Sequence, residues 1–220
     1  MYNITLVSSI HSELGKCTPE EFYQIVAAIN PDIIFEEICP NLFDILYNGK
    51  ENPYDTLEVK TVKMHLRDHD IKHIPIDIEP DPNYTLQDTK YMFGNFKKFE
   101  AYMKLENEQN TMTENDGFAF LNSKRLMEII EEKKLLELGL MNFLINRMQL
   151  SRIYNLFYEE HETRENKWLE NIYNYSKVNS YNNALFYCGA SHRKSLMQKI
   201  EDFEKKENFK LNWAFYSTNK

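Results

Sequence analysis

The first 35 residues constrain the fold most, because two short apolar runs flank one amphipathic segment. The apolar runs cover residues 4–7 and 33–35. Between them, Thr18, Pro19 and Glu21 form a capping box with proline at the first helical position. Apolar residues then recur on one helical face until an Asn-Pro pair stops the helix. Strand, helix and strand in this order form a βαβ unit, which implies parallel strands and a right-handed crossover.

Further strand and helix patterns extend this unit. A helical pattern at 56–67 precedes a third strand at 73–78, and a fourth strand at 184–188 precedes a helix and a last strand at 211–216. Residues 84–175 lack strand signals and show helical spacing. We therefore predict a single α/β domain formed by the whole chain, with a mainly parallel sheet flanked by helices and a large helical insertion before the late strands.

Composition and charge narrow the classes of partner. The chain has 34 acidic and 26 basic residues, a net charge of −8, which weighs against a nucleic-acid partner. No apolar stretch approaches the roughly 18 residues that span a membrane, and no secretion-signal pattern opens the sequence. Cys17, Cys39 and Cys188 lack CxxC spacing and fit reduced thiols. We expect a cytoplasmic protein without a membrane partner, and the sequence indicates no oligomeric state.

Polar side chains follow several of the predicted strands. Open parallel sheets bind ligands beyond the carboxyl ends of their strands, so these side chains are expected to converge there. Neighbouring strand residues point to opposite faces, so only one carboxylate of an adjacent pair can readily face the site. Two imidazoles and a carboxylate suit either a divalent metal or a metal-free site in which a histidine takes a proton from water, and both favour hydrolysis. The candidates are His11, Glu36, Glu37, Asp77, Glu79 and His192.

A second set of three histidines has helical spacing but is not predicted to form a site. His65, His69 and His73 lie four residues apart, as if one helix face offered three ligands. Residues 71–78 have an extended pattern, which would take His73 off the helix.

Two short motifs carry a resemblance to a known superfamily. Residues 189–192 read Gly-Ala-Ser-His, and residues 8–11 read Ser-Ser-Ile-His. They resemble the two GxxH motifs of the TraB, Tiki and erythromycin esterase superfamily, with serine in place of the first glycine. Residues 31–40, PDIIFEEICP, are similar to the TraB pattern of Pro-Asp, a hydrophobic strand and Glu-Leu-Cys, which places the family glutamate on Glu37.

A later segment extends the resemblance. Arg164 and Glu165, followed by Trp168, resemble the superfamily helix that bears an arginine with an acidic or amide neighbour. The resemblance covers roughly residues 3–40 and 155–205, and the helical insertion between them matches no pattern of the superfamily.

The resemblance implies a hydrolase acting on a small-molecule or peptide substrate. Similarity to Tiki implies a divalent metal of the manganese or cobalt class, held by His11, Glu37 and His192, and peptide hydrolysis. Similarity to erythromycin esterase implies metal-free attack of water on an ester. The catalytic set then includes Arg164 and Glu165, with Arg164, Asp77 and Glu36 contacting substrate. The alternative is a non-catalytic ligand-binding or regulatory protein with the same pocket, as the haem-binding ChaN branch permits.

Overall fold

The computed structural model describes residues 2–49 and 55–217, and within them the strands form one parallel sheet. Its order is β3-β2-β4-β1-β5, so β4 lies between the two strands of the first βαβ unit. This confirms the predicted α/β class and parallel sheet, although the third strand ends three residues earlier than expected. The strands are β1 (Asn3–Ser9), β2 (Ile33–Glu36), β3 (Lys72–Pro75), β4 (Asn183–Gly189) and β5 (Asn212–Phe215).

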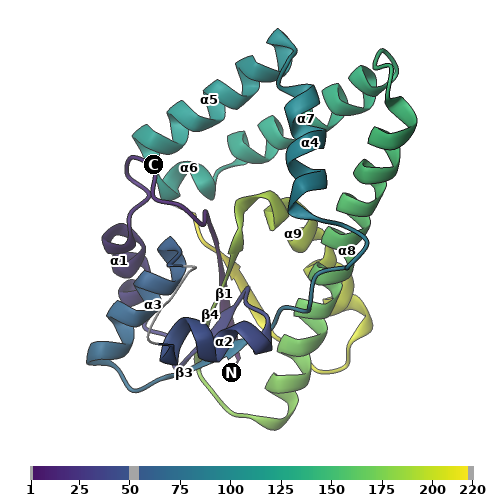
Figure 1. Ribbon diagram of the computed structural model, residues 1–220. Coiled ribbons are helices and arrows are strands. Elements are labelled where there is room, and N and C mark those ends of the chain that lie inside the picture. The colour runs from purple at the N-terminus through teal and green to yellow at the C-terminus, as the bar shows by residue number, and fades with distance from the viewer. Residues whose placement is uncertain (1, 50–54, 218–220) are drawn as a thin grey trace.

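Helices cover both faces of the sheet (Figure 1). On one face, α1 (Pro19–Ile29) and α3 (Leu57–Asp68) pack on the strands, and on the other face α8 (Arg147–Val178) and α9 (Arg193–Lys206) do so. Successive strand residues alternate between these two apolar cores, and both faces are buried. Burial on both sides explains why the strands read as continuous apolar runs. As predicted, Thr18 caps α1, since its hydroxyl accepts a hydrogen bond from the Glu21 amide at 3.2 Å.

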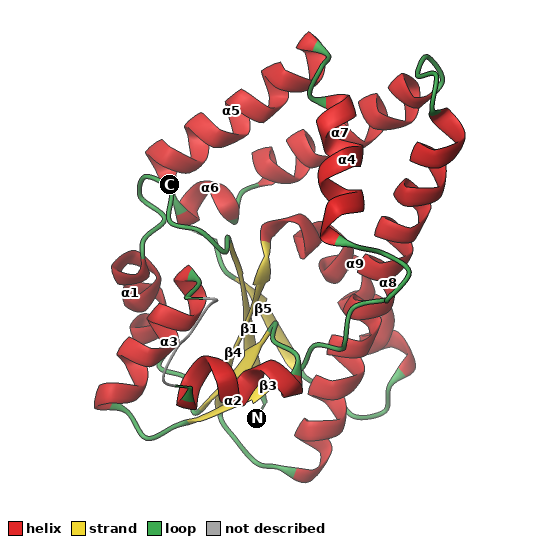
Figure 2. Ribbon diagram, viewed as in Figure 1, coloured by secondary structure: helices red, strands yellow, loops and turns green. Residues whose placement is uncertain are grey.

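The chain between β3 and β4 forms a helical layer (Figure 2). It consists of α4 (Leu86–Phe96), α5 (Glu100–Asp116), α6 (Phe118–Leu121), α7 (Lys124–Met141) and α8. This confirms the predicted helical insertion. One further helix, α2 (Pro40–Asn48), was not predicted.

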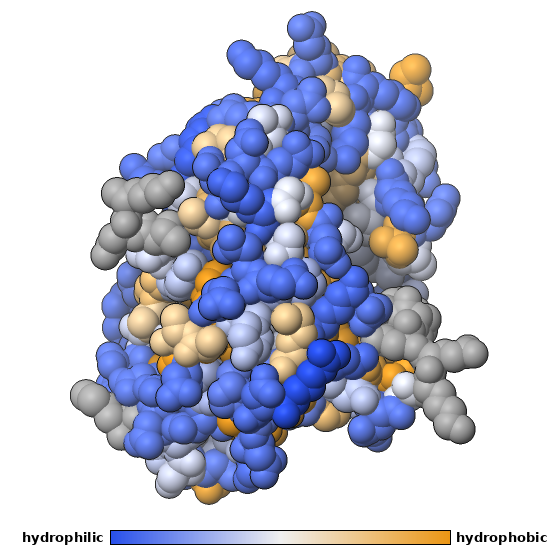
Figure 3. Space-filling view, turned by 90° about the vertical axis from the view of Figure 1, so that its left-hand side faces the viewer, coloured by the Kyte–Doolittle hydropathy of each residue, from blue (hydrophilic) through white to orange (hydrophobic). Residues whose placement is uncertain are grey.

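The surface and the cysteines agree with the sequence. No described helix is both long and apolar enough to cross a membrane. The face seen from the side of α1 and α3 is mainly hydrophilic, with hydrophobic residues scattered over it (Figure 3). All three cysteines are buried and free of disulfides.

Candidate functional site

Glu37 lies just past the end of β2, and both of its carboxylate oxygens have a partner. Oε1 accepts a hydrogen bond from Nη2 of Arg164 at 2.7 Å, and Oε2 accepts one from the Gly189 amide at 2.6 Å. The side chain is only 5% exposed. Glu37 is therefore fixed between α8 and the end of β4, because a buried carboxylate requires such partners.

Arg164 joins Glu37 to a second buried carboxylate. Its Nε and Nη2 donate to the two oxygens of Asp77 at 3.1 and 2.7 Å. Asp77 also accepts a hydrogen bond from the Trp168 indole at 2.6 Å. Arg164 was predicted to contact substrate, whereas these contacts favour a role in orienting Glu37. Asp77 holds Arg164 and Trp168 in place, which does not fit its predicted contact with substrate.

His192 and Glu165 form a buried imidazole–carboxylate pair. His192 ends the short helix η1 (Ala190–His192), and its Nδ1 lies 2.7 Å from Oε1 of Glu165 on α8. The other oxygen of Glu165 accepts a hydrogen bond from the Ser195 hydroxyl at 2.5 Å. Because an ionised carboxylate only accepts, a neutral imidazole in this position carries its proton on Nδ1 and leaves the Nε2 lone pair free. That Nε2 lies 3.9 Å from Oε1 of Glu37.

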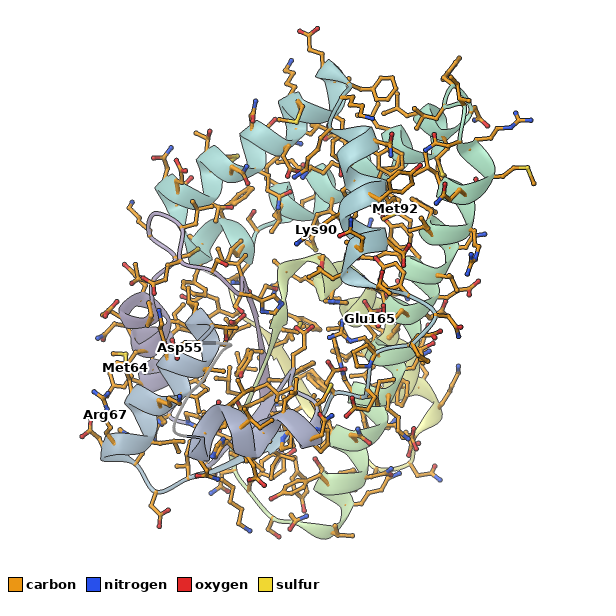
Figure 4. The ribbon with its side chains drawn as sticks, in the orientation of Figure 1. Asp55, Met64, Arg67, Lys90, Met92 and Glu165 are labelled. Carbon is orange, nitrogen blue, oxygen red and sulfur yellow. The ribbon has the colours of Figure 1, made fainter. Side chains whose placement is uncertain are left out.

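A second imidazole, His161, lies against His192. It is one helical turn before Glu165 on α8, and the ring centroids of the two histidines are 4.4 Å apart. Burial is the main cause that lowers the pKa of His161 from 6.5 to about 2. His161 is therefore neutral at physiological pH. Figure 4 shows Glu165 on the middle of α8, below the α4 segment that carries Met92.

The predicted ligand set of His11, Glu37 and His192 is not the one that the fold brings together. Among the described residues, the group whose donor atoms lie within 4.8 Å of one another consists of His161, Glu165 and His192. His11 contacts Glu58 of α3, on one face of the sheet. Glu37 contacts Arg164 of α8, on the other face, and Glu165 is itself a residue of α8.

His11 is held by a carboxylate of its own. Its Nδ1 lies 3.2 Å from Oε1 of Glu58 on α3, and the Ser9 hydroxyl donates to the same oxygen at 2.5 Å. Glu58 is almost fully buried, and its Oε2 has no hydrogen-bond partner among the described residues. The hydrogen bond to Glu58 raises the pKa of His11 from 6.5 to about 9, against the opposing effect of burial. The contact with Glu58 therefore favours the cationic form of His11 in the folded protein.

Glu36 is directed away from this site. It is fully buried, and its oxygens contact Nδ1 of His73 at 2.6 Å and accept hydrogen bonds from the hydroxyls of Tyr187, at 2.6 Å, and Tyr47. The predicted contact of Glu36 with substrate does not fit this burial. Strand alternation explains the difference, because Glu36 and Glu37 point to opposite faces of the sheet. As expected, His73 lies on a strand and not on a helix with His65 and His69.

A cavity of about 410 Å³ lies between the carboxyl edge of the sheet and the helical layer. Its floor includes residues 9–11 at the end of β1 and residues 189–191 at the end of β4. His161 and Phe157 of α8 form part of its wall. The helical insertion therefore covers the edge where the sequence placed the site, and the volume lies in the range of ligand pockets, about 300–1,000 Å³.

Two features of the site were not anticipated. His161 and Glu58 contribute side chains that the sequence analysis did not select. The four-residue spacing of His161 and Glu165, which puts both on one helix face, was the available signal for the first. Gly189 has an ordinary φ of −54°, and an added Cβ would make only ordinary contacts, 3.6 Å from Glu37 and His192.

The pH dependence of stability is expected to report on His11. The folded protein holds a proton on this imidazole that the unfolded chain releases, because the pKa is raised from 6.5 to about 9. The resulting stabilisation is complete below about pH 6.5 and is lost as the pH rises through about 9. Urea denaturation across this window should show the free energy of unfolding of the wild type falling with pH, and the His11→Gln variant losing this component.

The expected size of this component is small. The His11 side chain is 64% exposed, so solvent screens its interaction with Glu58. Wild type and His11→Gln with the same pH slope over that window would contradict the assignment.

No protein-family model matches this chain, and neither a curated protein nor a solved structure matches it.

Proposed function

We propose that this protein is a hydrolase in which His192 activates water for attack on an ester or amide bond. The observation that carries the proposal is the buried pair of His192 and Glu165, which leaves the Nε2 lone pair of His192 facing Glu37. A carboxylate that fixes the tautomer of a histidine is the arrangement by which a general base is prepared. The resemblance to the TraB, Tiki and erythromycin esterase superfamily supports the same reaction class.

Glu37 would position the nucleophile. The 3.9 Å between its Oε1 and Nε2 of His192 allows one water molecule to donate a hydrogen bond to each atom. Nε2 then takes a proton from that water as its oxygen attacks the carbonyl carbon. When the intermediate collapses, the proton passes from Nε2 to the departing alcohol or amine, and the acyl group leaves as a carboxylic acid.

His11 supplies the positive charge that the reaction requires. It lines the same cavity as residues 189–191, and Glu58 keeps it protonated at neutral pH. A fixed cation beside a developing oxyanion lowers the energy of the transition state relative to the bound substrate. His11 is thus assigned an electrostatic role in place of metal binding.

A divalent metal is compatible with part of this site. His161, Glu165 and His192 offer two nitrogens and one oxygen, a donor set that suits manganese, cobalt or zinc. When bound, such an ion would polarise the substrate carbonyl and lower the pKa of water. The oxygens of Glu165 are already hydrogen-bonded to His192 and Ser195, so metal binding competes with these bonds. The metal-free reaction is therefore the form that the geometry favours.

The proposal is tested with a panel of 4-nitrophenyl esters and short peptides, each assayed in the presence of a chelator and of manganese or cobalt. Turnover in the chelator that is lost in the His192→Gln variant supports metal-free hydrolysis. Turnover that requires added metal supports the metal-dependent form. Absence of turnover across the panel in both conditions counts against the hydrolase and favours a ligand-binding protein.

Added manganese or cobalt is expected to raise the melting temperature of the wild type only if His161 and His192 bind the ion. A ligand at 100 times its dissociation constant stabilises by about 2.7 kcal/mol. His161→Gln removes one donor while leaving the bond between His192 and Glu165 intact, so its response should be much smaller. Differential scanning fluorimetry with a metal series measures this difference. Equal stabilisation of both proteins would exclude His161 as a ligand.

A further inference from the structure

The end of α4 and the helices α5 and α7 form the part of the cavity wall that we call the roof. The roof contains two ammonium groups that share one carboxylate. Nζ of Lys97, at the end of α4, lies 2.6 Å from Oε1 of Glu106, and Nζ of Lys133 on α7 lies 2.5 Å from Oε2. Lys133 also donates to Gln109 at 2.7 Å. All four residues line the cavity. Glu106 therefore faces two positive charges with one negative charge.

The ammonium group of Lys133 is not solvated like that of an ordinary surface lysine. The Lys133 side chain is only 10% exposed, while Lys97 is 47% exposed. A buried ammonium interacts strongly with nearby charge because water does not screen it. The whole chain carries a net charge of −8, so the sign at this wall is opposite to that of the molecule.

The other carboxylate of the roof does not neutralise the pair directly. Glu137 accepts hydrogen bonds from the hydroxyls of Tyr102 and Tyr158, each at 3.0 Å. Burial raises the pKa of Glu137. Among the described residues neither Lys97 nor Lys133 forms an ion pair with Glu137, so Glu106 is the carboxylate that both ammonium groups contact.

Aromatic rings occupy the wall between the roof and the histidines. Phe93 and Phe157 lie edge to face with ring centroids 5.4 Å apart, and Phe157 contacts the ring of His161 at 4.1 Å. Tyr102 and Tyr158 line the same cavity. Such rings favour a ligand with an apolar, preferably planar body.

We propose that this cavity binds an organic anion, with its charged group against Lys97 and Lys133 and its apolar body between the aromatic rings. That this anion is the substrate rests on the proposed function, because the cavity is lined by His161, whose ring lies against that of His192. Arg164 is not needed for the anion, since it already holds Glu37 and Asp77.

Isothermal titration calorimetry tests the anion site. It measures the binding of benzoate, and of its neutral counterpart benzamide, to the full chain. Wild type is expected to bind benzoate about tenfold more tightly than benzamide, a preference that falls as salt is added. Lys97→Gln should remove most of this preference without changing benzamide binding. Lys98→Gln is the matched control, because Lys98 is exposed and does not line the cavity.

Glu106→Gln should change the affinity for benzoate in the opposite direction to Lys97→Gln. Removing the shared carboxylate frees both ammonium groups, so benzoate should bind more tightly than to the wild type, by about threefold or more. Undetectable benzoate binding, equal binding of benzoate and benzamide, or weaker benzoate binding in Glu106→Gln would overturn the inference.

These results are separable from those that test hydrolysis. His192→Gln should lose turnover and retain the preference for benzoate over benzamide. Turnover without a preference for benzoate would overturn the anion site alone, and a preference for benzoate without turnover would overturn the hydrolase alone.

Discussion

Replacing Glu165 with glutamine is expected to slow hydrolysis by about 10²- to 10⁴-fold, the usual contribution of a general base. Glutamine keeps the size of the side chain but can present an amide N–H to Nδ1 of His192. The imidazole would then carry its proton on Nε2, the atom that must accept a proton from water. The rate constant for turnover of the best ester or peptide from the panel measures the loss, and KM should change little.

Glu170→Gln is the matched control for this variant. Glu170 lies on the same helix, is exposed and pairs with Lys167 at the surface. It should turn over at the wild-type rate. A Glu165→Gln protein that is folded and retains wild-type turnover would show that the tautomer of His192 does not matter to the reaction.

Replacing Arg164 with methionine is expected to destabilise the fold by about 3–5 kcal/mol, the cost of removing one partner from a buried ion pair. Arg164 neutralises two carboxylates, and Glu37 and Asp77 are only 5% and 6% exposed. Methionine retains much of the apolar stem but leaves both acids without a counter-ion. Urea denaturation followed by circular dichroism measures the change.

Arg152→Met controls for the loss of an arginine from the same helix, because Arg152 is exposed. Its free energy of unfolding should change by less than about 0.5 kcal/mol. Equal stability of Arg164→Met and wild type would mean that Glu37 and Asp77 are not buried as ions.

The sequence predicted the sheet because its signals are local. Thr18 and Pro19 mark the start of α1, and continuous apolar runs mark strands whose two faces are both covered. The prediction that polar groups gather at the carboxyl edge follows from parallel strands alone. Glu37 and Glu165 both lie close to His192.

The partners of these residues could not be predicted in the same way. His161 reaches His192 only because α8, 32 residues long, packs across the face of the sheet, and no local pattern specifies that packing. Glu58 has the pattern of a first-turn helix residue but is buried against Ser9. This contact holds His11 on the α3 side, so His11 is not part of the group of possible metal ligands formed by His161, Glu165 and His192.

The side-chain contacts within the helical layer could not be predicted from the sequence for the same reason. Its helices are evident from spacing, but the meeting of Lys97, Glu106 and Lys133 depends on how three separate helices cross. Charged residues at helical spacing usually form solvated faces, so nothing in the sequence distinguishes the buried Lys133 from its exposed neighbours.

The protonation pattern of the His192 ring tests the central claim most directly, because it does not depend on finding the substrate. Imidazole ¹⁵N NMR of the full chain, with His192→Gln used to assign the resonances, reports which ring nitrogen carries the proton. At about pH 8, above the ordinary histidine pKa of about 6.5, the account predicts a proton on Nδ1 and a bare Nε2. In Glu165→Gln the proton should move to Nε2. A wild-type His192 protonated on Nε2 would contradict its assignment as the base that activates water.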